Sequence, residues 1–136
     1  MTEAKIQSHL IKWWQLAHRG LGVPDPRLLI MIPNGAYLGA GVKQVRGGRT
    51  FSLAAIRYAN LKRQGFVPGA PDLFLAVVRH GRGGLFLELK AERGRLSPVQ
   101  RDLHMVLRAS YQVEVVYGFE EAVTTIVTYL TGGRSK

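Results

Sequence analysis

The chain of 136 residues contains no cysteine. Disulfide bonds and thiolate zinc sites are therefore excluded, and any bound metal must use oxygen or imidazole ligands. No apolar run approaches the roughly 18 residues that a membrane span needs. The first residues also lack the apolar segment of a signal peptide. We therefore expect a cytoplasmic protein, long enough for one domain with its own hydrophobic core.

Acidic residues are scarce, with 9 Asp and Glu against 19 Lys and Arg, which gives a formal net charge of +10. No acid lies between Asp25 and Asp72, a stretch with seven basic residues: Arg27, Lys43, Arg46, Arg49, Arg57, Lys62 and Arg63. A field of one sign attracts polyanions, nucleic acid first among them. A solubilising surface and adhesion to anionic lipid are the alternatives, and the lack of an apolar amphipathic anchor disfavours them.

Hydrophobic periodicity predicts an α/β domain. The expected helices cover residues 3–18, 51–64, 98–109 and 119–130, and the expected strands cover 28–32, 72–78, 85–91 and 112–117. In this order they predict a mixed sheet between helices, with αβαββαβα connectivity. We expect one domain over residues 1–130 and a disordered tail over 131–136.

Three details of this pattern are specific enough to test. The first helix should bury Ile6, Leu10, Trp13 and Ala17, which recur at helical spacing. The short apolar run 28–32 should be a buried strand. Residues 33–50 are rich in glycine and basic side chains, so we expect a mobile basic loop there.

Charged residues interrupt two otherwise apolar strands, at Asp72, Glu88 and Lys90. Alternation along a strand puts Glu88 and Lys90 on the same face. If the two strands form a hairpin in which paired residue numbers sum to about 162, Asp72 opposes Lys90 and Glu88 opposes Phe74. The two acids and the lysine then share one face, and a slip of one residue would separate them.

Two adjacent carboxylates make a site for a hard divalent cation, and Mg²⁺ suits it best. Such an ion can lower the pKa of a bound water and neutralise charge on a phosphate. Lys90 could orient that water or stabilise the transition state. The alternative is a buried ion-pair cluster without metal, and these three residues alone do not decide between the two.

The motif Pro71-Asp72 followed by Glu88-Leu89-Lys90 resembles the PD-(D/E)xK signature of the restriction-endonuclease-like superfamily. The longer string from Gln64 to Leu75, with the segment from Leu96 to Gln100, resembles the virus-type replication-repair nuclease (VRR-NUC) family and its stand-alone phage-type members. The resemblance runs over roughly residues 3–130. It implies a restriction-endonuclease-like α/β core and a nuclease that depends on Mg²⁺ or Mn²⁺.

The resemblance also implies residue roles. Asp72 and Glu88 would bind the metal, with the backbone carbonyl of Leu89 and the carboxylate of Glu3 as further ligands. Asp72, Glu88, Lys90 and Gln100 would form the catalytic set, with Gln100 orienting Lys90 or a phosphate. Gln100 could instead complete a capping box with Ser97, and Glu3 could simply favour the positive start of a helix.

Basic residues on either side of these strands are candidates for contact with DNA, namely Lys43, Arg46, Arg49, Arg93 and Arg95. His104 lies four residues after Gln100 and could face the site, although a core or rim histidine is the better interpretation. The resemblance implies a homodimer that resolves Holliday junctions. A flap nuclease, an RNA-directed nuclease and a non-catalytic DNA-binding module of the same fold are the alternatives.

Overall fold

The computed structural model describes residues 1–33, 43–46 and 49–133, and of residues 43–46 and 49–51 it describes the backbone alone. Its elements in chain order are α1 (Glu3–Ala17), the 3-10 helix η1 (Pro26–Leu28), β1 (Leu29–Met31), β2 (Lys43–Arg46), β3 (Arg49–Ser52), α2 (Leu53–Arg63), β4 (Leu73–Leu75), β5 (Leu85–Lys90), α3 (Pro98–Leu107), β6 (Gln112–Tyr117) and α4 (Phe119–Thr131). The predicted αβαββαβα order is confirmed.

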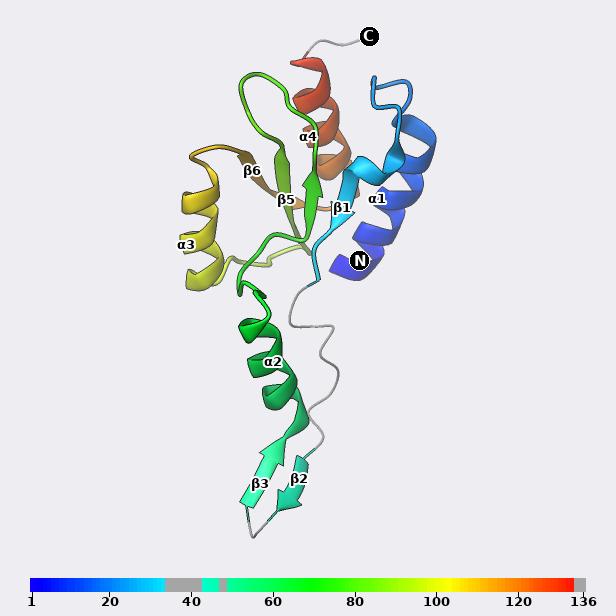
Figure 1. Cartoon of the computed structure of the whole chain (residues 1–136). Helices are drawn as coiled ribbons and strands as arrows, with labels where there is room; N and C mark the ends of the chain where they lie inside the picture. Colours follow the sequence, from blue (N-terminus) through cyan, green and yellow to red (C-terminus); the bar gives the residue numbers. More distant parts are fainter. Residues whose placement is uncertain (34–42, 47–48, 134–136) are drawn as a thin grey trace.

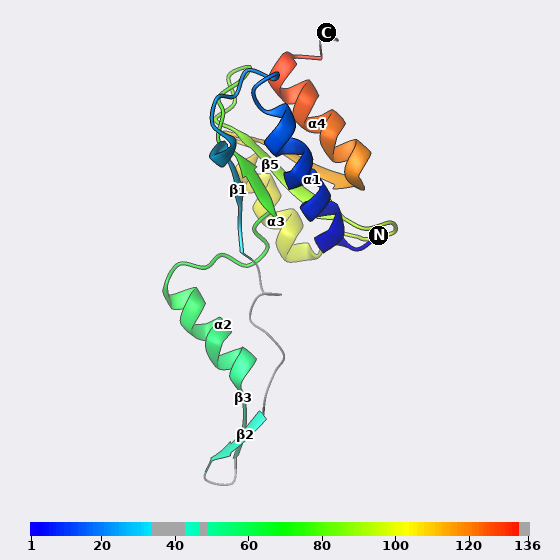
Figure 2. The same ribbon diagram turned by 90° about the vertical axis from the view of Figure 1, so that its right-hand side faces the viewer.

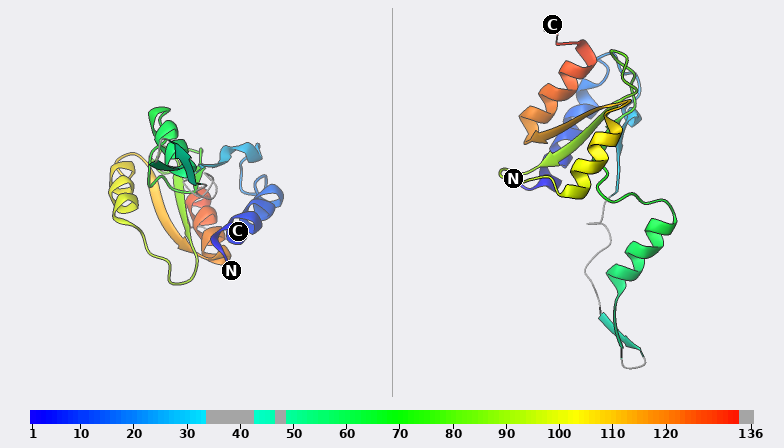
Figure 3. Two further views of the ribbon diagram at one scale, coloured as in Figure 1. Left: turned by 90° about the horizontal axis from the view of Figure 1, so that it is seen from below. Right: turned by 90° about the vertical axis from the view of Figure 1, so that its left-hand side faces the viewer.

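A mixed four-stranded sheet forms the body, with strand order β1-β4-β5-β6 (Figure 1). The β1–β4 and β4–β5 pairs are antiparallel, and the β5–β6 pair is parallel. Helices α1 and α4 cover one face of the sheet and α3 covers the other (Figure 3, right). The predicted α/β fold with a sheet between helices is therefore confirmed.

Leucines of β4 and β5 form the centre of the core. Leu73, Leu75, Leu85, Leu87 and Leu89 have no exposed surface and pack with side chains of α1 and α4. Burying a leucine side chain stabilises a fold by about 1.5–3 kcal/mol. This layer therefore holds the two strands firmly and directs their alternate residues toward α3.

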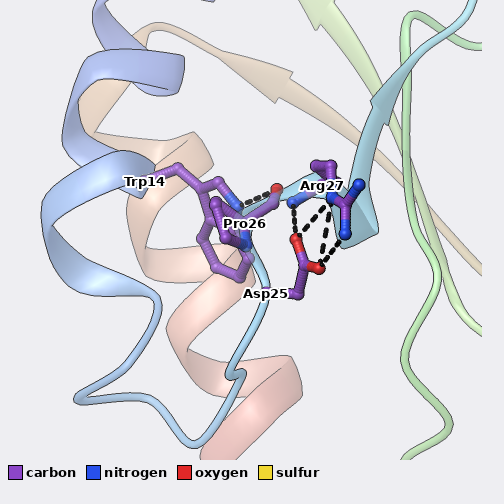
Figure 4. Close-up of polar contacts among 4 residues, drawn as sticks. All are labelled: Trp14, Asp25, Pro26 and Arg27. Carbon is purple, nitrogen blue, oxygen red and sulfur yellow. Dashed lines mark hydrogen bonds and ion pairs between the residues drawn. The ribbon is translucent and has the colours of Figure 1, made fainter.

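The buried face of α1 differs from the prediction at two positions. Ile6, Leu10 and Trp14 are buried, whereas Trp13 and Ala17 are only half-buried. The indole Nε1 of Trp14 donates a hydrogen bond of 2.8 Å to the Pro26 carbonyl (Figure 4). This bond satisfies the polar atom of the buried indole, which is what allows Trp14 to occupy the interior position.

The segment that follows α1 is ordered by its own side chains. Asp25 caps η1 by accepting from the Arg27 N–H at 2.9 Å, and its carboxylate pairs with the Arg27 guanidinium at 2.7 Å (Figure 4). The hydrogen bond from the Arg27 side chain lowers the pKa of Asp25 to about 2. These contacts lead the chain directly into β1.

The observed hairpin register differs from the prediction by two residues. Leu73 pairs with Leu87 and Leu75 with Leu85, so paired numbers sum to 160 rather than 162. An even shift preserves the faces, and Asp72, Glu88 and Lys90 still share one side of the sheet. The expected pairing of Asp72 with Lys90 is wrong, however, because this register places Asp72 opposite Glu88.

The apolar run at residues 28–32 contains the strand β1 (Leu29–Met31), but this strand is not buried. β1 forms an edge of the sheet, where Leu29 is buried and Ile30 and Met31 are 45% and 43% exposed. The prediction of a buried strand fails because one edge and much of one face of β1 have no covering element in the described part of the chain.

Helix α2 and the β2–β3 hairpin project from the body as an arm (Figures 1 and 2). The predicted loop over 33–50 is wrong for residues 43–46 and 49–50, which pair in this hairpin. Helix α2 begins after its cap Ser52 and ends before Gly65, whose φ of 100° closes the C-terminal turn. It has no buried residue, so the body does not cover it.

The last helix ends one residue later than expected. α4 includes Thr131, so the predicted tail does not begin there, and residues 134–136 lie outside the described part. None of the helices in the described ranges has the length and apolar character that crossing a bilayer requires.

Candidate active site

The three charged residues singled out in the sequence converge at one end of the β4–β5 pair. Asp72 immediately precedes β4, and Glu88 and Lys90 belong to β5. All three are buried, with exposed fractions of 8%, 2% and 9%. The Leu89 N–H donates to Asp72 Oδ2 at 2.7 Å, which fixes one carboxylate against the neighbouring strand. Since the leucines of β5 face α1 and α4, Glu88 and Lys90 point to the α3 side.

Glu88 resists ionisation in this environment. Burial, a hydrogen bond with Asp72 and charge repulsion from Asp72, in that order of size, raise its pKa to about 9. The Lys90 ammonium opposes the shift, and Glu3 adds to it. Glu88 therefore holds its proton at neutral pH, because a second charge beside a buried carboxylate is unfavourable without a cation.

The donor set fits a hard divalent cation. Two carboxyl groups lie side by side, and the buried Glu88 Oε1 has no hydrogen-bond partner among the residues that the structure describes. Mg²⁺ is commonly held by one or two carboxylates, with water and substrate phosphate completing its shell. In the described part of the chain, no three His, Asp or Glu side chains gather closely enough to hold a metal by themselves.

Lys90 is held by the start of α3. Its Nζ donates to Gln100 Oε1 at 3.3 Å, and the same oxygen accepts from the Ser97 N–H at 2.9 Å. The Gln100 N–H donates in return to Ser97 Oγ at 3.2 Å, which completes a capping box. The two alternatives for Gln100 are thus combined, since one oxygen caps the helix and orients the lysine.

His104 faces the site from the next turn of α3. It has no exposed surface, and its Nε2 lies 3.6 Å from Glu88 Oε1. Neither ring nitrogen has a hydrogen-bond partner among the described residues, and burial lowers the pKa of the imidazole. The sequence favoured a core or rim position for His104 and did not predict its contact with Glu88. The spacing of four residues after Gln100 was the available signal.

The remaining candidates lie farther from this cluster or outside the described side chains. Glu3 is the exposed first residue of α1, and its charge reaches Glu88 only weakly. Arg93 and Arg95 are exposed in the loop that follows Lys90. Lys43, Arg46 and Arg49 lie on β2 and β3, and only the backbone of these three residues is described.

A cleft of about 360 Å³ opens onto the carboxylates. Its lining combines residues of α2, the loop before β4, the two acids and the start of α3: Tyr58, Pro68, Gly69, Ala70, Asp72, Glu88, Ser97, Val99 and Gln100. A larger hollow of about 570 Å³ lies beside the starts of α1 and α4, but it contains none of the three charged residues. The smaller cleft is therefore the candidate active site.

Two comparisons with known proteins give a match. The family model described as "VRR-NUC domain" matches residues 1–120. A solved structure described as "VRR_NUC domain protein" superposes with a TM-score of 0.72 at 21% identity, covering 96% of this chain and 89% of that chain. At this identity the structural match shows the fold alone. A search of curated proteins found no match.

Proposed function

Because this chain belongs to the VRR-NUC family, whose domain implies a nuclease, we propose that it is a metal-dependent endonuclease that hydrolyses phosphodiester bonds in branched DNA. The observation that carries this proposal is the joint burial of Asp72, Glu88 and Lys90 on one side of the β4–β5 pair, where the two acids line a cleft. An ion-pair cluster alone would leave Glu88 Oε1 unsatisfied.

The proposed catalytic set is Asp72, Glu88, Lys90 and Gln100. Asp72 and Glu88 would hold Mg²⁺ or Mn²⁺, with Glu3 and the Leu89 carbonyl as further ligands. When bound, the cation would activate water and neutralise charge on the scissile phosphate. Lys90 would place its ammonium beside that phosphate, and Gln100 would hold the ammonium in place through the 3.3 Å contact.

Basic residues supply the proposed contacts with the DNA backbone. Arg93 and Arg95 directly follow the catalytic strand, and Lys43, Arg46 and Arg49 belong to the hairpin of the arm. Contacts of this kind position DNA without reading its sequence. They support a nuclease that recognises the shape of its substrate.

Our first proposed substrate is a Holliday junction, cut by a homodimer. Symmetric cleavage of a four-way junction needs two active sites facing opposed strands, and a two-fold dimer provides them. A flap structure is the second candidate. A nuclease domain over residues 1–130, a cytoplasmic location and a phage origin stay predictions. A mass in solution equal to one chain at micromolar concentration would contradict the dimer.

Cleavage of labelled DNA tests the catalytic proposal. Linear, flap, splayed and four-way substrates are incubated with Mg²⁺, with Mn²⁺ and with EDTA. We expect cleavage of at least one branched substrate, none in EDTA, and a loss of about 10²–10³-fold in rate for Lys90→Met. Lys12→Met, on the exposed side of α1, is the matched control and should cleave like wild type.

Two results would contradict this proposal. If no DNA is cut, the alternative of a non-catalytic DNA-binding module of this fold is favoured. If Lys90→Met and Asp72→Asn cut as well as wild type, the proposed catalytic set is wrong. Cleavage of flaps without cleavage of junctions would retain the nuclease and change its substrate. Cleavage of RNA in preference to every DNA would favour the RNA-directed alternative.

A further inference from the structure

The arm and the body meet at the catalytic cleft. Tyr58, in the middle of α2, lines the same cleft as Asp72 and Glu88. α2 buries no residue against the body, yet the Tyr58 ring is only partly exposed. The two acids and the Tyr58 ring therefore come from different elements and form different walls of the same cleft.

The ring is supported at its edge and approached by a cation. Phe66 contacts Tyr58 edge-to-face, with ring centroids 5.7 Å apart and planes inclined by 77°. Lys62, one turn along α2, places its Nζ over the ring at 5.5 Å from the centroid. Lys62 is itself exposed, so its long side chain can move its ammonium to a nearby anion.

The composition of this wall suits a nucleotide. α2 carries Arg57, Lys62 and Arg63 and has no acidic residue. The cleft volume of about 360 Å³ is within the range of pockets that take small ligands. An aromatic ring stacks on any base, and an ammonium beside it attracts the phosphate of the same strand.

We propose that the Tyr58–Lys62 face of α2 is a subsite for one unstacked nucleotide of the DNA strand being cut. The Tyr58 ring stacks on the base, and the Lys62 ammonium moves from the ring to the flanking phosphate. A base inside a duplex has both faces covered by its neighbours, whereas a base at a branch point offers one. This inference rests on the proposed nuclease function and supplies a reason for selecting branched over linear DNA.

Binding measurements test the subsite without requiring cleavage. DNA with a 2-aminopurine at a branch point, and a duplex with 2-aminopurine in its interior, are titrated with protein in EDTA. We expect Tyr58→Leu to weaken binding of the branched DNA by about 5- to 100-fold and to leave duplex binding within about twofold. Tyr58→Phe keeps the ring and should bind like wild type. The 2-aminopurine fluorescence at the branch point should change on binding to wild type and much less with Tyr58→Leu.

Matched controls separate the subsite from general effects. Tyr117→Leu removes a tyrosine that is 45% exposed and lines the larger hollow instead of the cleft, and it should not alter binding. Lys62→Gln should weaken binding more than Lys12→Gln. Thermal unfolding of each variant identifies any that fail to fold, and Tyr58→Phe remains informative if Tyr58→Leu does fail.

The outcomes also distinguish this inference from the proposed function. If wild type cleaves branched DNA but Tyr58→Leu binds it like wild type, or loses duplex binding equally, the subsite is wrong and the nuclease proposal stands. A fluorescence change that persists in Tyr58→Leu would also overturn the subsite. If wild type cleaves nothing with Mg²⁺ while the Tyr58 effect on binding is present, the nuclease proposal fails and the subsite stands as a DNA-binding site.

Discussion

At the scale of single residues, Glu88 is the position where folding and the proposed function oppose each other. The folded protein keeps a proton on Glu88 up to about pH 9, whereas an unfolded chain releases it near 4.5. The folded state then binds more protons, so its stability falls as pH rises between these two values. A buried carboxyl group that lowers the stability of the fold is typical of sites where its negative charge binds a ligand.

We therefore predict that Glu88→Gln stabilises the metal-free protein. Glutamine has nearly the same shape, carries no charge and can donate its amide N–H to the Asp72 carboxylate. In EDTA, the melting temperature of the variant should exceed that of wild type at pH 8, and the difference should grow from pH 6 to pH 9. Any stabilisation that Mg²⁺ gives wild type should be lost, together with cleavage.

The control for this prediction is an exposed carboxyl near the same strand. Glu92→Gln removes an acid two residues after Lys90 and should change the melting temperature little at any pH in this range. A lower melting temperature for Glu88→Gln than for wild type at pH 8 would show that ionised Glu88 stabilises the fold, contrary to the raised pKa.

His104 shows what residue patterns cannot provide. Its spacing from Gln100 places both on neighbouring turns of α3, but the sequence does not say how closely α3 approaches the sheet. That approach depends on tertiary packing at this face of the sheet, where Phe74 and Phe86 stack with centroids 4.4 Å apart. The contact of 3.6 Å between His104 and Glu88 follows from this packing, and it was not predictable from the helix alone.

At the scale of elements, alternation and capping signals were sufficient for most of the fold. They predicted all four helices and the strands of the central sheet, because apolar periodicity and the cap at Ser97 act locally. They did not predict the hairpin register, since any even shift keeps the same faces buried. They also missed that α2 would bury nothing, because amphipathic spacing does not reveal whether a partner surface exists.

The loop between the arm and β4 is the element whose geometry the site depends on most directly. Gly69 has a φ of 83°, and a Cβ there would lie 2.9 Å from both Cγ1 and O of Val99. Gly22 has the same φ of 83° but nothing within 4 Å of such a Cβ. An alanine at Gly22 would therefore cause backbone strain alone, whereas an alanine at Gly69 would cause the same strain and a steric clash with Val99.

We predict that Gly69→Ala damages both stability and activity. Gly22→Ala should cost about 1 kcal/mol through strain alone, and Gly69→Ala should cost about 1–3 kcal/mol more because the methyl group pushes against α3. Moving this loop displaces Asp72 from the start of α3, so cleavage should fall for Gly69→Ala and not for Gly22→Ala. Denaturant unfolding and single-turnover cleavage measure the two effects. Equal stability losses in the two variants would contradict the steric contact.

At the scale of the whole molecule, charge is distributed unevenly. The chain from Pro26 to Pro71, which includes the arm, contains no acid, whereas α4 begins with Glu120 and Glu121 in its first turn. The arm lies below the catalytic end of the sheet in Figure 1, and the N-terminal turn of α4 belongs to the body. The net charge of +10 attracts DNA, and we expect the DNA to bind along the arm, which has no acidic residue.

The salt dependence of DNA binding tests whether DNA binds preferentially to the arm. Each phosphate contact contributes about −0.9 to the slope of log K against log salt concentration. The double variant Arg57→Gln/Arg63→Gln, on exposed positions of α2, should reduce the magnitude of the slope by up to about 2. Lys5→Gln/Lys12→Gln removes the same charge from exposed positions of α1 and should leave the slope nearly unchanged. If both double variants reduce the slope equally, DNA responds only to the total charge of the protein, and the arm is not a preferred binding surface.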